Sequence, residues 1–144
     1  MIGIAERGRR FLLLVFLVLL PGCGSTATVE GTVTLDDSPV ETGYITFVPI
    51  EGTGGPGSRA SIANGRYAID RDSRAHPGVY RVEISSQRKT GKQIPAGSPA
   101  PRGTMVDEQV EAVPAQYNKK SNLRQELKAG ASTNVDFALT TKAN

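Results

Sequence analysis

The chain has little of what disulfide-stapled proteins and common enzymes use. It contains one cysteine, one histidine and no tryptophan among its 144 residues. A single cysteine cannot form an internal disulfide, which excludes a fold stapled by such bonds. With His76 as the only imidazole, a Ser/His/Asp triad would need that residue as its base. The spacings H-E-x-x-H, G-x-S-x-G and the P-loop are also missing, so we expect no enzyme, no metal and no bound cofactor, with a hydrolase using His76 as the open alternative.

A strong excess of one charge sign is also missing from most of the chain. Three of the 17 basic residues and one of the 14 acidic residues lie within residues 1–22, which leaves a net charge of about +1 for the rest. Such a balance gives no electrostatic basis for binding nucleic acid, and we expect none as a partner.

The N-terminus reads as an export signal. Residues 1–10 are positively charged, and Phe11 to Leu20 form an uninterrupted apolar run. A membrane-spanning helix needs about 20 such residues, whereas the apolar region of a secretory signal has about 7–15. We therefore predict that residues 1–22 are a cleaved signal peptide.

The end of that signal carries a resemblance. Leu20-Pro21-Gly22-Cys23 resembles the lipobox of bacterial lipoproteins. The resemblance implies that the Cys23 thiol receives a diacylglyceryl group, that cleavage occurs before Cys23, and that the new amino group receives an acyl chain. Two or more chains give stable anchoring. The expected partner is a bacterial membrane, on its periplasmic or outer face, with residues 23–28 as a short tether.

The chain after the tether alternates apolar and polar residues in short runs. Period-two alternation is typical of half-buried strands, and Asn64-Gly65 is typical of a type I′ hairpin turn. We count about seven strands, which predicts an all-β fold, a seven-stranded antiparallel sandwich over residues 29–140, with residues 141–144 as a frayed tail. The runs are 28–35, 43–49, 59–70 (a hairpin), 79–86, 123–128 and 133–139.

Residues 87–122 lack this alternation and hold four prolines, so we predict a long irregular loop, functional or disordered. Within it, "DEQVEAV" favours either a short strand or one helical turn. The first half of the loop is basic. It is either an ordinary solvated loop or a contact for anionic lipid headgroups. Its cationic residues are Arg88, Lys89, Lys92 and Arg102.

Three motifs give a second resemblance. "VEGTVTLDDSPVETGYITFVP", "NGRYAI" and "HPGVYRVEIS" resemble the carboxypeptidase regulatory-like, or transthyretin-like, β-sandwich. The later "VPAQYNKKSNLRQELKAGASTNVDFAL" resembles the end of short predicted bacterial lipoproteins built on that sandwich. The resemblance implies a domain without catalytic machinery, whose specific function the motifs do not define.

Ligand-binding residues are not identified by any motif. We expect Tyr67 and Tyr80 to pack in the core and Tyr117 to plug one end of the sandwich. An exposed aromatic on a loop end would instead favour a module that binds an envelope carbohydrate or protein, and burial of all four tyrosines would count against it. For the aspartates we favour ordinary turn chemistry over a calcium site, because calcium needs six to eight oxygens. These aspartates are Asp36, Asp37, Asp70 and Asp72.

Overall fold

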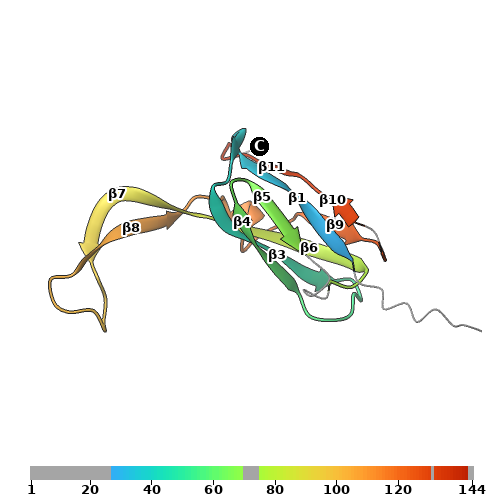
Figure 1. Ribbon diagram of the computed structural model, residues 1–144, viewed down its shortest axis with the longest axis horizontal. Helices are drawn as coiled ribbons and strands as arrows, with labels where there is room; N and C mark the ends of the chain where they lie inside the picture. Colours follow the sequence, from blue (N-terminus) through green and yellow to red (C-terminus); the bar gives the residue numbers. More distant parts are fainter. Residues whose placement is uncertain (1–26, 70–74, 131, 143–144) are drawn as a thin grey trace, which may run out of the picture.

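The computed structural model describes residues 27–69, 75–130 and 132–142, which form an all-β domain and a projecting hairpin (Figure 1). None of the described residues forms a helix long and apolar enough to cross a membrane. In chain order, the strands and the 3₁₀ helix η2 of the described residues are β1 (Thr28–Leu35), β2 (Ser38–Pro39), β3 (Thr42–Ile50), β4 (Ser58–Ala63), β5 (Arg66–Ile69), β6 (Gly78–Ser85), β7 (Gln87–Pro95), β8 (Met105–Glu111), η2 (Ala115–Tyr117), β9 (Arg124–Leu127), β10 (Ser132–Asn134) and β11 (Phe137–Leu139).

The main sheet curls back on itself. Its strand order is β10-β1-β5-β4-β3-β6-β9, with β2 and β11 also paired to β1. The pairing of β4 with β5 is limited to Ala63 and Arg66, beside the hairpin turn. Phe47 on β3 and Tyr67 on β5 have ring centroids only 6.2 Å apart, although β4 separates these strands in the sheet. The half that contains β1 and β5 therefore faces the half that contains β3 and β6.

The core fills the space between these halves and follows the predicted alternation. Val29 and Val33 on β1, and Ile45 and Phe47 on β3, are buried, as the period-two pattern predicts. Full burial of one such side chain stabilises a fold by about 1.5–3 kcal/mol. The β4–β5 turn also agrees with the sequence, because Asn64 and Gly65 adopt φ angles of 50° and 75°, the positive values that a type I′ turn requires.

The sheet departs from the predicted antiparallel arrangement at one edge. β10 and β11 pair in parallel with β1, while β9, which precedes them, pairs with β6 at the other edge. The chain crosses from one half of the sheet to the other between Leu127 and Ser132, and so it meets β1 running in the same direction. The expectation of about seven strands is also too low, because two-residue β2, the arm strands and the interruption between β10 and β11 add to the number.

Gly31 explains why the edge strand is interrupted between β10 and β11. The backbone at Val135 lies directly over Gly31, where an added Cβ would be only 1.8 Å from the Val135 carbonyl oxygen. The Val135 amide donates to the Glu30 carbonyl over 2.8 Å, and the Asp136 carboxylate accepts hydrogen bonds from the Thr32 amide and hydroxyl. Only glycine permits this close approach of the two strands.

The segment 87–122, predicted as an irregular loop, is largely regular, which corrects that prediction. β7 and β8 form a two-stranded antiparallel hairpin, here called the arm (residues 87–111), that projects from the domain (Figure 1). The strand alternative for "DEQVEAV" holds as far as Glu111. Neither face of the arm is buried, so its sequence has no apolar alternation, and the prolines lie at its end or beyond it.

Two predicted boundaries also change. Ala27, assigned to the tether, is only 1% exposed, and its amide donates to the Ala75 carbonyl over 2.8 Å, so the folded domain has begun by that residue. Thr141, assigned to the frayed tail, donates hydrogen bonds from its amide and hydroxyl to the Asp36 carboxylate. A side chain on the β1–β2 turn therefore holds the end of the chain through residue 141.

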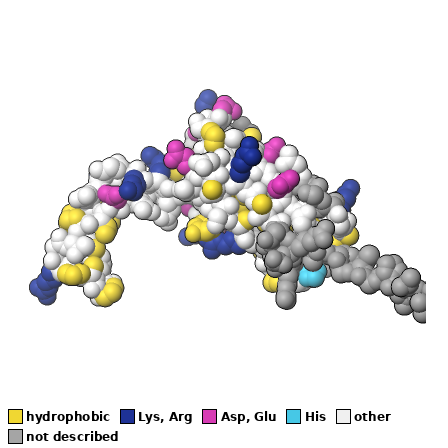
Figure 2. Space-filling model, in the orientation of Figure 1, with side chains coloured by type: hydrophobic (Ala, Val, Ile, Leu, Met, Phe, Trp, Pro, Cys, Tyr) yellow, Lys and Arg dark blue, Asp and Glu magenta, His cyan; other side chains and the backbone are white. Residues whose placement is uncertain are grey.

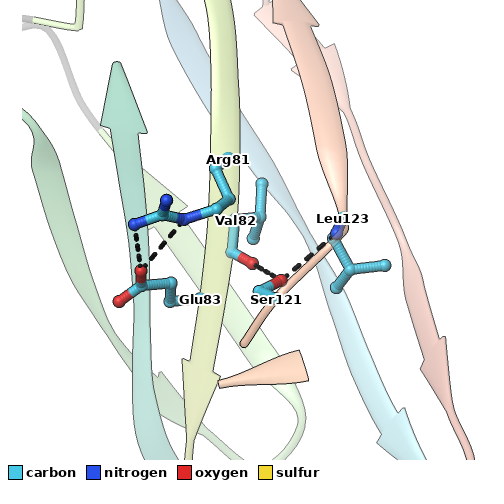
Figure 3. Close-up of polar contacts among 5 residues, drawn as sticks. All are labelled: Arg81, Val82, Glu83, Ser121 and Leu123. Atoms are coloured by element: carbon cyan, nitrogen blue, oxygen red, sulfur yellow. Dashed lines mark hydrogen bonds and ion pairs between the residues drawn. The ribbon is translucent and has the colours of Figure 1, made fainter. Parts of the chain in front are cut away.

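The connection to β9 is held by a buried serine, drawn in Figure 3. The Ser121 hydroxyl donates to the Val82 carbonyl on β6, and the Leu123 amide donates to the Ser121 hydroxyl over 3.2 Å. Arg81 and Glu83, two residues apart on β6, form an ion pair of 2.7 Å on the outer face. Ser121 thus extends the contact of β6 with its edge strand beyond β9 itself.

Candidate binding groove

An open hollow of about 1110 Å³ lies where the arm leaves the domain. One wall is the root of the arm, the opposite wall is the segment that includes β2, and the floor is the outer face of β3 and β4. We call this hollow the groove. Its lining residues are Leu35, residues 38–44, Arg59, Ser61, Ile62, residues 85–89, Gln109 and Ala112.

Tyr44 lies on the floor of the groove. Because Ile45 and Phe47 point into the core, the alternating geometry of β3 directs Tyr44 outward, where it is 48% exposed. Its register partners are Ser61 on β4 and Ser85 on β6, so an aromatic ring lies between two hydroxyl side chains in one cross-strand row. An exposed ring beside two hydroxyl side chains can contact the apolar part of a ligand while the hydroxyls form hydrogen bonds with its polar groups.

Arg59 covers that ring. Its guanidinium carbon lies 4.0 Å from the centroid of the Tyr44 ring. A cation–π contact of this kind contributes about 0.5–1 kcal/mol at an exposed site. The contact holds the guanidinium over the floor of the groove, where its N–H donors can meet an anionic ligand.

The groove carries an excess of positive charge. Arg59, Arg88 and Lys89 line it, whereas Glu41 is the acidic residue among the lining residues. Lys89 forms an ion pair of 2.6 Å with Asp107, which raises the pKa of Lys89 through the hydrogen bond and the charge of the carboxylate. Among the described residues, Arg59 and Arg88 have no ion-pair partner, so their charges are available to a ligand.

Glu111 fixes the arm wall to the floor. One carboxylate oxygen accepts hydrogen bonds from the backbone amides of Ser86 and Val113, over 2.9 and 3.1 Å. The other accepts hydrogen bonds from the Ser85 hydroxyl and the side-chain amide of Asn118, over 2.7 and 2.9 Å. Burial acts to raise the pKa of Glu111, but these hydrogen bonds outweigh it and leave the pKa below its ordinary value. The arm root is therefore a defined wall.

The tyrosines divide as the sequence predicts, with one important exposed member. Tyr67 and Tyr80 are buried, and their hydroxyls donate to the carbonyls of Val135 and His76 over 2.8 and 2.7 Å. Tyr117 is half-buried and packs against the core. Tyr44 is exposed on strand β3 rather than on a loop end, so it does not match the aromatic position expected for a binding module, although not all four tyrosines are buried. Sequence alternation places Tyr44 on an outer face, but nothing in the sequence brings the arm root to it.

His76 lies away from the groove. The residue is exposed, its carbonyl accepts from Tyr80, and its ring lies against Gly55. It lines neither the groove nor the smaller hollow beside Tyr117 and Leu123. The predicted lipobox, Leu20 to Cys23, and the aspartates Asp70 and Asp72 lie outside the described residues.

Asp36, one of the candidate aspartates, has a role in the fold. Asp36 accepts hydrogen bonds from Thr140 and Thr141, and these bonds lower its pKa. Within residues 27–69, 75–130 and 132–142, no three His, Cys, Asp or Glu side chains gather in a way that could hold a metal ion.

Comparisons with known proteins found no match for the chain. No protein-family model matches the chain, and no curated protein or solved structure matches it significantly.

Proposed function

We propose that the chain is a non-catalytic, lipid-anchored protein of the bacterial cell envelope whose groove binds an extended anionic polymer. The N-terminal charge, the apolar run and the lipobox-like Leu20-Pro21-Gly22-Cys23 support the anchor. The described domain begins at Ala27, so the tether after Cys23 has only a few residues and would hold the domain close to the bilayer.

We also propose that the curled sheet is a transthyretin-like sandwich. Without β2 and the arm, the sheet has positions for β1, β3, β4, β5, β6, β9 and the interrupted β10/β11 strand, which supports a seven-position sandwich. The facing of β3 and β5 through Phe47 and Tyr67 supports two layers.

The Tyr44–Arg59 pair is the observation that carries the ligand class. A ring between two hydroxyls suits the apolar face and the polar edges of a sugar. Arg59 on the ring and Arg88 on the wall add positive charge, which suits carboxylate or phosphate groups on such a ligand. The groove is open to solvent rather than enclosed, so it accommodates a segment of a chain more readily than a small molecule.

The binding proposal is tested by calorimetric titration with oligomers of galacturonic acid, compared with neutral galactose oligomers. The acidic oligomer should bind more tightly, and Tyr44→Ala should weaken its binding by about ten-fold or more. Arg59→Ala should weaken binding of the acidic oligomer while Arg66→Ala, which removes an exposed arginine outside the groove, should not. Equal affinities of the two arginine variants, or binding unchanged in Tyr44→Ala, would contradict the proposal.

The alternative ligand is an extended protein segment, which the same floor and walls could hold. It predicts that both oligomers fail to bind, while a proteinaceous envelope fraction protects Tyr44 and Arg59 from chemical modification. Arg66 serves as the unprotected control.

The anchor is tested separately, by detergent fractionation and by mass spectrometry of the N-terminal peptide. The peptide should begin at Cys23 and carry the mass of a diacylglyceryl group with an additional acyl chain. Cys23→Ala should release the protein from the membrane fraction. An unmodified Cys23, or unchanged membrane retention of the variant, would overturn the anchor and leave the groove proposal intact.

A further inference from the structure

The end of the arm exposes an apolar belt that packs against nothing in the described part of the chain. Ile94, Met105 and Val106 are 41%, 48% and 43% exposed. Figure 2 shows hydrophobic side chains gathered on the distal half of the arm, away from the domain. A two-stranded hairpin alone is only marginally stable in water, so exposed apolar side chains on such an element need a physical reason.

The belt is apolar on both faces of the hairpin. Ile94 pairs with Val106, and the next pair along is Pro95 with Met105. Successive residues of a strand point to opposite faces, so each face of the ribbon carries one apolar pair. A flat protein surface would cover only one of these faces. An apolar medium that surrounds the tip would cover both.

The charge of the tip indicates what kind of surface covers the belt. Residues 92–106 include Lys92 and Arg102 and no aspartate or glutamate. Both cations are exposed, and neither has an ion-pair partner among the described residues. Two tips of the same charge repel each other, which argues against a tip-to-tip contact with a second copy. An anionic surface attracts the tip, by about 1 kcal/mol for each cation close to a charged bilayer.

We propose that the tip of the arm inserts shallowly into the interface of an anionic lipid bilayer. The belt of Ile94, Pro95, Met105 and Val106 would lie among the headgroups and the first acyl carbons, with Lys92 and Arg102 extending to the phosphates. This inference rests on the arm alone and does not need the lipid proposed at Cys23.

The position of the arm adds a geometric consequence. Ala27 pairs with Ala75, just before β6 begins, whereas the arm follows the end of β6 (Figure 1). An eight-residue strand is about 26 Å long. A chain that touches one bilayer through both its N-terminus and its tip must therefore lie along the surface rather than stand on it.

The test places an environment-sensitive NBD label at the tip of the full-length chain. Met105→Cys is made in a Cys23→Ser background, so that the label has one thiol to react with. Vesicles of phosphatidylcholine mixed with phosphatidylglycerol should shift the label's emission to the blue and raise its intensity, and pure phosphatidylcholine vesicles should produce much less change. The same label at Arg66→Cys, on the body of the domain, controls for binding through the N-terminal segment.

Two sets of variants complete the test. Lys92→Glu with Arg102→Glu should abolish the shift at position 105, and Ile94→Ser with Val106→Ser should reduce it several-fold. No shift on vesicle-bound protein would overturn the proposal. A shift without vesicles that grows with protein concentration would also overturn it, in favour of a second copy as the occupant.

Discussion

The hydroxyl of Tyr67 on β5 donates a hydrogen bond to the carbonyl of Val135, 2.8 Å away, at the point where the edge strand of the sheet is interrupted. The two residues lie 68 positions apart in the chain. Burial, followed by the charge of Asp136, raises the pKa of Tyr67 well above its ordinary value, so the hydroxyl stays protonated and keeps donating.

Tyr67→Phe should destabilise the fold, because the Val135 carbonyl would lose its donor while its surroundings stay apolar. We expect a loss of about 1–2 kcal/mol in the free energy of unfolding, measured by urea denaturation. Tyr44→Phe is the control, since Tyr44 is 48% exposed and its hydroxyl forms no hydrogen bond with another of the described residues. A loss of the same size in both variants would contradict a role for the Tyr67–Val135 bond.

Gly31→Ala should be more damaging. The added Cβ would overlap the Val135 carbonyl oxygen, and the backbone of either β1 or the edge segment would have to move. Overpacking of this kind costs about 1–3 kcal/mol, measured by the same denaturation curves. Gly54→Ala adds the same methyl group where nothing lies within 4 Å, so its midpoint should stay close to that of the parent chain.

The Glu111 carboxylate makes the arm root sensitive to acid. The pKa of Glu111 is lowered in the folded chain, so its stabilising effect is complete above the ordinary carboxyl value of 4.5 and is lost as the pH falls through the lowered value. The protection of the Ser86 and Val113 amides from hydrogen exchange, taken relative to the exchange rates of unstructured peptide amides at the same pH, should therefore fall at acidic pH before that of the core amides.

Glu111→Gln is the matched variant for this effect. It should lose about 1 kcal/mol of stability at neutral pH, because the amide nitrogen cannot accept the hydrogen bonds that the carboxylate accepts. Its Ser86 and Val113 amides should be weakly protected from exchange at all pH values, and that protection should depend less on acid. A protection that falls equally with acid in both proteins would assign the effect to another carboxyl group.

Salt should weaken the binding of an acidic oligomer to the groove, because the Arg59 and Arg88 charges are exposed and screened by ions. Titrations at rising ionic strength should give a falling affinity for the parent chain and a shallower decline for Arg59→Ala. Arg66→Ala should keep the slope of the parent chain. A parent affinity that does not change with salt would contradict a charge-based groove.

The sequence predicts those parts of the fold that depend on alternation and local turn chemistry. The inward sets on β1 and β3, the Asn64-Gly65 turn and the outward position of Tyr44 all follow from period two. The parallel edge does not, because it depends on how Val135 packs over Gly31, a contact between distant parts of the chain. The arm could not be predicted for another reason. Neither face of this hairpin is buried, so its strands show no alternation of apolar and polar residues.

The groove depends both on local alternation, which the sequence shows, and on contacts between distant parts of the chain, which it does not show. Its floor lies on a predicted strand, while its walls come from the arm root and the β2 segment, whose positions the sequence does not define. The candidate site is therefore a tertiary feature. The alternation of β3 places Tyr44 on an outer face, and the basic stretch with Arg88 and Lys89 is visible in the sequence, but neither signal brings these residues together.

The Glu111 hydrogen bonds hold the base of the arm against the sheet. Ser85 and Ser86 line the groove and also donate hydrogen bonds to the Glu111 carboxylate, so a ligand that displaces either serine would weaken the attachment of the arm. β7 has nine residues and extends about 30 Å, so a rotation of about 10° at the base of the arm would displace its tip by about 5 Å. A ligand in the groove that moves Ser85 or Ser86 would therefore also move the tip, at the far end of the arm.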